Sequence, residues 1–412
     1  MVSLRGLGTV MDDSPKLKAP IRVGIDGRIL MHYEMRGLAR YTVEICGAMK
    51  EIAGDGIELY SFSPGAIAPE FLKRLDLTRV IFQARREMLW EHVELPRQLR
   101  RNRIEVFHAT AERGLPYHRV CKYVLTRHDI IDRLPEYCGG ENWRGRLRKK
   151  LSDFVSVRRA DKFITVSNFS KEDICRYYGL APERVLVTYN AAHPRFYEAV
   201  PAAKIIRVRK QYALPDRYFL FLGGFDFKKN VTMLVEAFAR LSPDAPSLVL
   251  AGEHKWEFLS VFEKIRALGL PGRIVCPGLI ADEDLPAIYQ GALAFVHPSR
   301  YEGFGLQLVE AMASGVPVLA SSTTSMPEVL DGSGLLFNPD DSLSIAEQME
   351  RVFRDSDLRE TLIQKGRQRA QFFSWKKSAA QTLGLYSELL GRTGDLLNGN
   401  IEPLPVSRGQ RG

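Results

Sequence analysis

The sequence predicts an α/β fold made of two doubly wound domains, each built around a parallel sheet. Short apolar runs of strand length alternate with stretches whose apolar residues follow helical spacing, which is typical of successive βαβ units. The alternation begins at residue 21, pauses in a polar stretch over residues 199–217, and then begins again. The 412 residues also suit two or three domains at roughly 150 residues per domain.

In the first half, six apolar runs are expected to be strands, and residues 39–52 (ARYTVEICGAMKEI) are expected to form a helix. The runs are IRVGID (21–26), IELYSF (57–62), VFHA (106–109), KYVLTRHD (122–129), KFITVS (162–167) and VLVTY (185–189). They are separated by stretches long enough for crossovers, so we expect a mainly parallel sheet.

The second half repeats this pattern with five expected strands and four expected helices. The strands are YFLFLGG (218–224), SLVLAG (247–252), RIVCPG (273–278), ALAFVHP (292–298) and PVLAS (317–321), and the helices are 231–241, 262–269, 283–291 and 306–315. We therefore place one domain at residues 20–195 and a second at 196–372. Residues 1–19 and 392–412 are predicted to be disordered. Because ligands bind at the carboxyl ends of such strands, the active site is expected between the domains.

Composition excludes several classes of protein. No apolar run approaches the ~18 to 20 residues that a membrane-spanning helix needs. The first twenty residues have no continuous apolar core and contain Asp12 and Asp13, which makes them a poor secretory signal. The five cysteines are widely spaced without any C-x-x-C, so neither a disulfide framework nor a zinc site is predicted. A cytosolic location is the expectation.

The positive charge lies in the first half. Residues 1–200 hold 34 Lys and Arg against 25 Asp and Glu, whereas residues 201–412 hold 24 of each. Residues 143–159 (WRGRLRKKLSDFVSVRR) carry seven basic residues and one acidic residue. The run suits either a solvated helix face or an amphipathic helix on anionic lipid. Nucleic-acid binding is disfavoured because no helix-turn-helix, zinc finger or array of stacking aromatics accompanies the run.

The most informative stretch is SRYEGFGLQLVEAMASGVPVLASSTTSMPEV (299–329). Gly303 and Gly305 interrupt helical register between Glu302 and Glu310, which places Glu302 in a loop and Glu310 inside the following helix. The two carboxylates should therefore face different parts of one ligand. Glycines that open a helix leave backbone N–H groups at its positive end, where phosphate binds readily. On spacing alone, an ordinary helix with a glycine-rich entry loop is an equal alternative.

These residues resemble the signature of glycosyltransferase family 4, the retaining nucleotide-sugar transferases of the GT-B fold, which have two Rossmann-like domains and an interdomain cleft. The family's E-G-F-G-x-x-x-x-E motif, its A-x-x-x-G-x-P-V and its P-E-V are all present in order. Other stretches are similar to further family motifs: residues 36–49 to the amino-terminal glycine loop, 124–138 to the histidine-aspartate strand end, 160–197 to the run into the linker, and 223–241 to the glycine-and-lysine loop. Residues 373–391 resemble the last helix, which in the family returns to the first domain.

The resemblance implies a role for each matching residue. Glu310 would bind the donor ribose, Glu302 the transferred sugar, and Lys229 the diphosphate. His128 and Asp129 would lie near the transferred sugar, so His128, Asp129 and Glu302 are the candidate catalytic residues. The remaining candidate donor-binding residues are Gly37, Lys228, Gly303, Phe304, Gly305 and Leu306. No cofactor and no metal are expected, because a cation and a helix terminus can stabilise the departing diphosphate. Asp282 and Asp284 are interpreted as an N-terminal helix cap.

Two departures and two histidines qualify this interpretation. Many family members carry Arg at the position of Gly224, and Lys228 is the nearest substitute for its charge. A second family glycine is Ala39 here, although Gly37 and Arg40 remain. His108 ends a strand, and a packing role is one of two equal alternatives for it. His297 also follows a strand, and there a packing role is favoured.

The resemblance implies a retaining hexosyltransferase that uses a nucleoside-diphosphate sugar, with a mannosyl group from a GDP-sugar as the first guess. The acceptor would be a glycan or a lipid-linked saccharide in cell-surface polysaccharide or lipopolysaccharide biosynthesis, and the enzyme would be cytoplasmic with a peripheral contact on the inner face of the membrane. The alternatives are a noncatalytic nucleotide-sugar-binding protein, or an epimerase or phosphorylase of the same fold. A nicotinamide dehydrogenase is disfavoured because no G-x-G-x-x-G follows the first strand.

Overall fold

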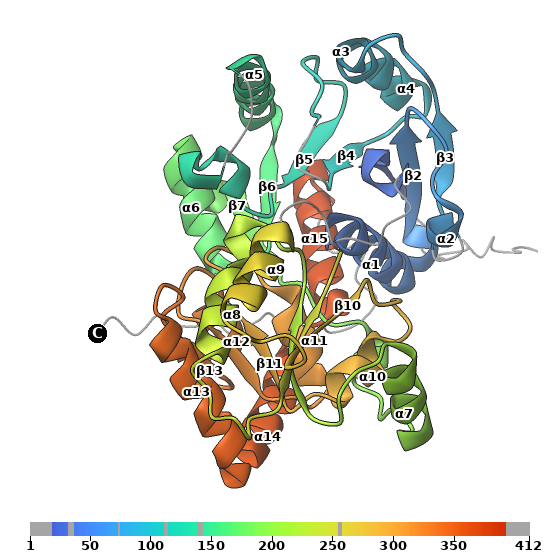
Figure 1. The fold of residues 1–412 in the computed structure, drawn as a ribbon. Coiled ribbons are helices and arrows are strands. Elements are labelled where there is room, and N and C mark those ends of the chain that lie inside the picture. Colours follow the sequence, from blue (N-terminus) through green and yellow to red (C-terminus); the bar gives the residue numbers. More distant parts are fainter. Residues whose placement is uncertain are drawn as a thin grey trace, which may run out of the picture.

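The computed structural model describes residues 19–31, 37–72, 75–110, 114–137, 143–253 and 258–392. Two parallel sheets divide these residues, as the sequence predicts (Figure 1). The predicted disorder of residues 1–19 and 392–412 falls almost wholly outside the described residues. Arg392 is described, and its guanidinium lies 2.7 Å from Glu105 of the first domain.

The first sheet has seven strands in the order β3-β2-β1-β4-β5-β6-β7. Every described pair of neighbours is parallel. The strands are β1 (Ile21–Asp26), β2 (Ile57–Ser63), β3 (Thr78–Ile81), β4 (Val106–Ala109), β5 (Lys122–Thr126), β6 (Lys162–Thr165) and β7 (Val185–Val187).

The second sheet has six strands in the order β10-β9-β8-β11-β12-β13, and its described pairs are also parallel. The strands are β8 (Tyr218–Leu222), β9 (Ser247–Ala251), β10 (Ile274–Gly278), β11 (Ala294–His297), β12 (Val318–Ser321) and β13 (Leu335–Phe337). Two of the four edge strands, β3 and β13, are absent from the sequence prediction. The other eleven strands coincide with the predicted apolar runs.

Helices cover the two sheets (Figure 1). In the first domain they are α1 (Gly37–Ala53), α2 (Pro69–Leu72), α3 (Glu87–Leu89), α4 (Leu95–Arg101), α5 (Trp143–Arg159) and α6 (Asn168–Tyr178). The remaining helices are α7 (Ala202–Gln211), α8 (Val231–Phe238), α9 (Phe258–Ala267), α10 (Leu285–Gln290), α11 (Leu306–Ala313), α12 (Met326–Leu330), α13 (Ser342–Arg354), α14 (Ser356–Phe372) and α15 (Trp375–Leu390).

The last helix joins the end of the chain to the first domain. Helix α15, red in Figure 1, lies alongside α1. Ser374 caps α15 by accepting a hydrogen bond from the N–H of Lys377. At the start of α15 the Trp375 ring packs 6.0 Å from the ring of Tyr41, and further along the Tyr386 hydroxyl lies 2.6 Å from a ring nitrogen of His108. Both contacts are buried, so the helix is part of the first domain's core.

The strand order fixes where a ligand should bind. Each sheet reverses its direction of winding once, between β1 and β4 in the first domain and between β8 and β11 in the second. Ligands of doubly wound sheets bind at such switch points, outside the carboxyl ends of the strands. Residues 223–230 follow β8 and residues 298–305 follow β11, so the two predicted donor loops of the second domain lie side by side at its switch point.

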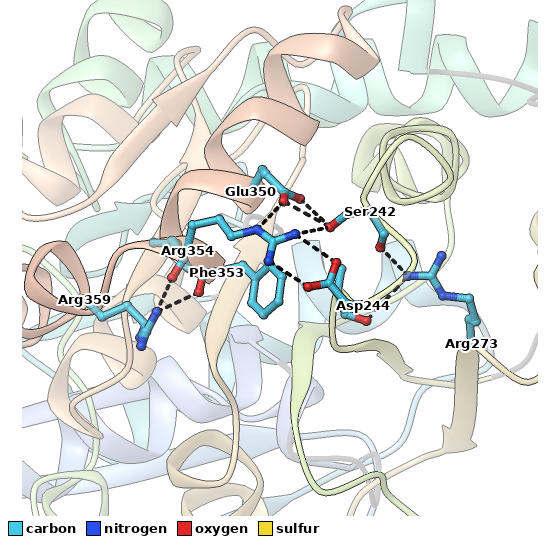
Figure 2. A network of polar contacts seen from close by, with 9 residues as sticks. Ser242, Asp244, Arg273, Glu350, Phe353, Arg354 and Arg359 are labelled. Carbon is cyan, nitrogen blue, oxygen red and sulfur yellow. Dashed lines mark hydrogen bonds and ion pairs between the residues drawn. The ribbon is translucent and has the colours of Figure 1, made fainter.

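A polar network at the surface of the second domain joins α13 to the turn after α8 (Figure 2). Arg354 lies 2.7 Å from Asp244 and 2.8 Å from Glu350, and it donates a hydrogen bond to Ser242. The hydrogen bond from Arg354 lowers the pKa of Asp244 to about 2. None of these residues is a predicted site residue, so we assign the network a structural role.

Candidate active site

The loop that precedes α11 is pressed against the first domain. A Cβ added to Gly303 would lie 2.6 Å from the carbonyl oxygen of His128 and 3.0 Å from Cβ of Asp129. On the other side, the Ser167 hydroxyl donates a 2.6 Å hydrogen bond to the Gly303 carbonyl. Gly303 therefore has no room for a side chain, and it brings the predicted donor loop to the predicted catalytic strand end of the other domain.

Gly305 ends this loop and begins α11. Its φ of 81° lies in the left-handed region that glycine adopts without strain, and it occupies the N-cap position of the helix. The first N–H groups of a helix have no partners within the helix, so the start of α11 suits an anionic group. Leu306 is the first residue of the helix. The Phe304 ring packs 5.5 Å from the Phe373 ring, so a donor would meet the backbone of Phe304.

Glu302 belongs to a buried cluster with Lys229 and His297. Its Oε1 lies 2.6 Å from Lys229 Nζ and 3.3 Å from His297 Nε2. Burial opposes ionisation of Glu302, but the positive charge of Lys229 and the contact with His297 outweigh it and hold the pKa of the carboxyl well below its ordinary value. The cluster therefore offers a carboxylate and an ammonium group at one place.

Lys228 lies near the same cluster. Its positive charge also lowers the pKa of Glu302, and its carbonyl accepts a hydrogen bond from the Arg300 N–H. A Cβ added to Gly224 would meet only Asp226, at 3.2 Å. The structure thus places a second cation beside Glu302, whereas Gly224 itself supplies none.

Glu310 belongs to a separate buried cluster. Its Oε1 lies 2.5 Å from Arg40 Nη1 of α1, and its Oε2 accepts a 3.2 Å hydrogen bond from the Tyr289 hydroxyl of α10. Burial raises the pKa of Glu310, and the charge of Arg40 opposes that rise. Because Glu302 and Glu310 have different partners, the two carboxylates face different groups, in agreement with the expectation from their spacing.

The helix-cap interpretation of the acidic cluster at 282–284 is wrong. Asp284 occupies the N-cap position of α10, but its side chain forms no capping hydrogen bond. It accepts hydrogen bonds from Tyr212 and Gln211 instead. Asp282 forms ion pairs with Arg40 and with Arg195, because these two guanidinium groups meet it at the junction of the domains. Among the described residues there is no cluster of three or more His, Cys, Asp or Glu side chains that could hold a metal ion.

His128 and Asp129 follow β5 and are largely withdrawn from solvent. His128 Nε2 lies 3.1 Å from the Thr110 carbonyl oxygen, and the ring packs edge-on against Tyr41 at 4.7 Å. Burial lowers the pKa of His128 to about 4, with a smaller opposing effect of its hydrogen bond to Thr110. Asp129 Oδ1 accepts a hydrogen bond from the Ile131 N–H, which holds the turn that carries the histidine.

The neutral state of His128 predicts a flat pH dependence. We expect kcat/KM to show no histidine-type inflection between about pH 5.5 and 8, because the imidazole gains its proton only near pH 4. Initial rates of wild type and His128→Gln over this range test the expectation. An inflection near pH 6.5 that disappears in His128→Gln would contradict it.

Gly37 is the first residue of α1, and a Cβ added there would meet no atom of the described residues within 4 Å. A cavity of about 780 Å³ lies nearby, lined by α1 and by the chain crossings at residues 191–197 and 371–376. None of the predicted site residues lines this cavity.

The sequence did not predict the contacts that Arg40, His297 and Tyr289 make with Glu310 or Glu302. His108 is fully buried between Tyr386 and Thr126, which confirms its packing role. His297 is also fully buried, but it contacts Glu302, so its interpretation as a packing residue is incomplete. Arg40 stands in the glycine loop that the sequence singled out. The glycine loop is thus the sequence signal that could have pointed to Arg40. The contact of Arg40 with Glu310 could not be predicted, because Glu310 lies 270 positions away in the sequence.

Comparison with known proteins covers both domains. Residues 35–196 match the family model of Glycosyltransferase Family 4, and residues 204–369 match that of Glycosyl transferases group 1. The chain is 33% identical over 276 residues to the O-antigen chain mannosyltransferase B of Escherichia coli, covering 66% of this chain and 72% of that protein. It is 30% identical over 303 residues to the serotype-specific mannosyltransferase WbdA of Escherichia coli, covering 72% of this chain but 36% of the longer WbdA.

A solved structure supports the fold. Anabaena HepE in complex with UDP and glucose superposes with a TM-score of 0.72 at 19% identity, covering 89% of this chain and all of that one. At this identity the likeness shows the arrangement of the two domains and no more. Since both halves match family models and a 33% identical relative is covered over 72% of its length, the chain belongs to the family 4 glycosyltransferases and is a glycosyltransferase of GT-B architecture.

Proposed function

We propose that the enzyme transfers a hexosyl or deoxyhexosyl group, with retention of anomeric configuration, from a nucleoside-diphosphate sugar to a glycan or a lipid-linked saccharide. A mannosyl group from a GDP-sugar is the first choice, because the relatives named above are mannosyltransferases of bacterial O-antigen chains. Synthesis of a cell-surface polysaccharide or lipopolysaccharide is the process that fits. The observation that carries the proposal is the pair of separate clusters around Glu302 and Glu310 at the domain junction.

The clusters suggest how a donor would lie. The Glu310 carboxylate would accept hydrogen bonds from the ribose hydroxyls, and Lys229, Lys228 and the start of α11 would neutralise the diphosphate. Glu302 would accept hydrogen bonds from the transferred sugar. Lys229 Nζ lies 2.6 Å from Glu302, a distance that suits two groups meeting a donor where its sugar and phosphate join. Positive charge at that point stabilises the transition state as negative charge develops on the leaving diphosphate.

Acceptor deprotonation would then be assisted by the leaving phosphate on the same face of the sugar. His128 is neutral near pH 7 and its Nε2 is engaged with the Thr110 carbonyl, so it suits a hydrogen-bonding role better than that of a strong base. Asp129 supports the turn that holds the histidine. Gly37 would allow backbone to approach the ligand from the first domain, whereas Gly303 lets the second domain's loop lie against His128 and Asp129.

We also propose that α5 docks on anionic lipid, which suits a lipid-linked acceptor. Four large apolar side chains on this helix are exposed: Trp143 by 63%, Leu147 by 49%, Leu151 by 58% and Phe154 by 55%. Their spacing of four, four and three residues places them on one helix face. Among the described residues no helix is long and apolar enough to cross a bilayer, so the contact would be peripheral.

Cations flank this apolar face, and Asp153 anchors the opposite one. The guanidinium of Arg144 lies 5.4 Å from the centre of the Trp143 ring, and that of Arg158 lies 4.2 Å from the Phe154 ring. Asp153 is buried and forms ion pairs with Arg133 and Arg127, which flank the turn at residues 128–129. A fixed inner face, an exposed apolar stripe and flanking cations are the features of an interfacial helix.

The engagement of Asp282 and Asp284 by protein groups supports catalysis without a divalent metal. We therefore expect activity to persist in excess EDTA, because Lys229 and Lys228 supply positive charge at the phosphate site. The measurement is nucleotide release with and without chelator. Loss of activity that Mg²⁺ or Mn²⁺ restores would refute this expectation.

Nucleotide binding tests the donor assignment. We expect purified protein to bind GDP more tightly than UDP, ADP or dTDP, and Glu310→Ala to bind it about 10-fold to 100-fold more weakly, the usual cost of a lost hydrogen bond to a charged group. Titration calorimetry with the four diphosphates provides the measurement. Unchanged affinity in Glu310→Ala would contradict the ribose role. Binding without any sugar transfer to acceptors would favour the noncatalytic alternative.

A further inference from the structure

Arg40 connects the two domains at the proposed ribose site. It lies in the first turn of α1, and its Nη1 is 2.5 Å from Glu310 while its Nη2 contacts Asp282. The Arg40 side chain is 13% exposed and that of Glu310 is 2% exposed. A guanidinium can engage two carboxylates at once because its donors form a rigid planar fork, which a lysine ammonium does not offer.

We propose that Arg40 is a positioning residue for the donor: it orients the Glu310 carboxylate to accept the ribose hydroxyls, and it does so from the opposite domain. The inference rests on the proposed ribose role of Glu310. It follows that ribose recognition requires the first domain to lie against the second, as the two domains do here.

The hydrogen bonds of Glu310 allow this role. Arg40 contacts one oxygen of the carboxylate, and the Tyr289 hydroxyl donates to the other. These two contacts fix the orientation of the group. An ionised carboxylate has about four acceptor sites, so each oxygen retains capacity for a ribose hydroxyl. Arg40 and the ribose can therefore share Glu310.

Asp282 extends the contact to the chain crossing between the domains. Its second oxygen lies 2.7 Å from Arg195, in the single helical turn Pro194–Phe196. Arg40 from the first domain, Arg195 from the crossing, and Asp282 with Glu310 from the second domain thus form one continuous ionic chain. The position of Arg40 is set by both domains.

The electrostatics of Glu310 provide a readout that a packing role would not affect. The charged and titratable groups that act on it are Arg40, Asp282, Arg195 and Tyr289. Burial and Asp282 favour its protonated form, whereas Arg40 and Arg195 favour the carboxylate. Without Arg40 the pKa of Glu310 should rise, so the carboxylate should be lost at a higher pH than in wild type.

The test compares binding of GDP and 2′-deoxy-GDP by calorimetry from about pH 6 to 8.5. If UDP binds more tightly than GDP, ADP and dTDP in the titrations described above, UDP and 2′-deoxy-UDP are used in place of the guanosine nucleotides. We expect wild type to prefer the ribonucleotide about tenfold at every pH. Arg40→Met should bind the ribonucleotide about tenfold more weakly near pH 7, lose most of the preference, and recover affinity as pH rises. Arg40→Lys should show an affinity and a ribonucleotide preference between those of wild type and Arg40→Met. It replaces Arg40→Met in the test if that variant does not fold.

Glu328→Gln is the matched control. Glu328 also joins the domains, accepting hydrogen bonds from the N–H groups of Asn168 and Phe169, but it is not part of the Arg40 contacts. The Glu328→Gln variant should prefer the ribonucleotide to the same extent as wild type. If Arg40→Met keeps the wild-type preference while Glu310→Ala loses it, the inference is wrong and the proposed function stands. If Glu310→Ala also keeps the preference, the ribose site itself is misassigned.

Discussion

Lys229→Met is expected to lower kcat/KM at least ~100-fold, the loss typical when a preorganised group that stabilises transition-state charge is removed. It should also destabilise the protein, because Lys229 and Glu302 are about 90% and 87% withdrawn from solvent and the remaining carboxylate would be buried without its partner. Breaking a buried ion pair on one side costs ~3–5 kcal/mol. Thermal unfolding and initial rates measure the two effects separately.

The double variant Lys229→Met/Glu302→Gln separates folding from chemistry. Removing both charges should restore most of the lost stability but none of the lost activity, because the folded protein would still lack the cation that we propose to bind the phosphate. Lys264→Met is the matched control, since Lys264 pairs with Glu236 at 2.5 Å in the same domain but both side chains are about one-third exposed. Such a pair contributes ~0–1 kcal/mol. Recovered activity in the double variant would show that Lys229 serves only to neutralise Glu302.

The core strands and the donor loops could be predicted from the sequence because both depend on local patterns. Buried strands such as β8 and β11 are continuous apolar runs, and the loops that carry Lys229 and Glu302 follow them directly. The topology of a doubly wound sheet then brings those loops together without further information. The start of α11 was predictable for the same reason, because Gly305 marks it in the sequence.

Two of the four edge strands, β3 and β13, could not be predicted this way. Strand β3 has three residues that are largely exposed and one that is half-buried, so it lacks the apolar run of a central strand. Strand β13 spans three residues, and Leu336 within it is 40% exposed. Both are strands because a neighbouring strand offers backbone hydrogen-bond partners, a tertiary cause that leaves little trace in local composition.

The ionic contacts between the domains also escaped prediction. Asp282 and Asp284 precede a helix, and at such positions a carboxylate usually caps the first turn. Here Arg40 and Arg195 attract Asp282, because packing of the two domains brings those groups close. Tyr212, which follows α7 in the same domain, donates a hydrogen bond to Asp284. The local rule fails where a stronger partner arrives from another part of the chain.

The helix α5 should determine membrane binding. We expect wild type to co-sediment with vesicles that contain anionic lipid, and to do so less at high salt, since screening weakens the attraction of cations to the surface. Replacing Leu147, Leu151 and Phe154 by Ser should lower the partition coefficient at least ~100-fold, because each exposed apolar side chain contributes roughly 1 kcal/mol or more on insertion.

A second variant isolates the electrostatic part. Arg144→Ser, Lys150→Ser and Arg158→Ser together should remove most of the salt dependence, at ~1 kcal/mol for each cation near the surface. Helix α7 offers the control, because it is also basic and exposes Ile206 by 45%, yet it belongs to the second domain. Ile206→Ser with Lys210→Ser should bind as wild type does. If wild type ignores anionic vesicles, or if the α5 and α7 variants bind equally, the apolar face of α5 does not contact lipid. If the molecular mass of wild type in solution rises with protein concentration, and only the Leu147, Leu151 and Phe154 variant lacks this rise, that face instead binds a second copy of the chain.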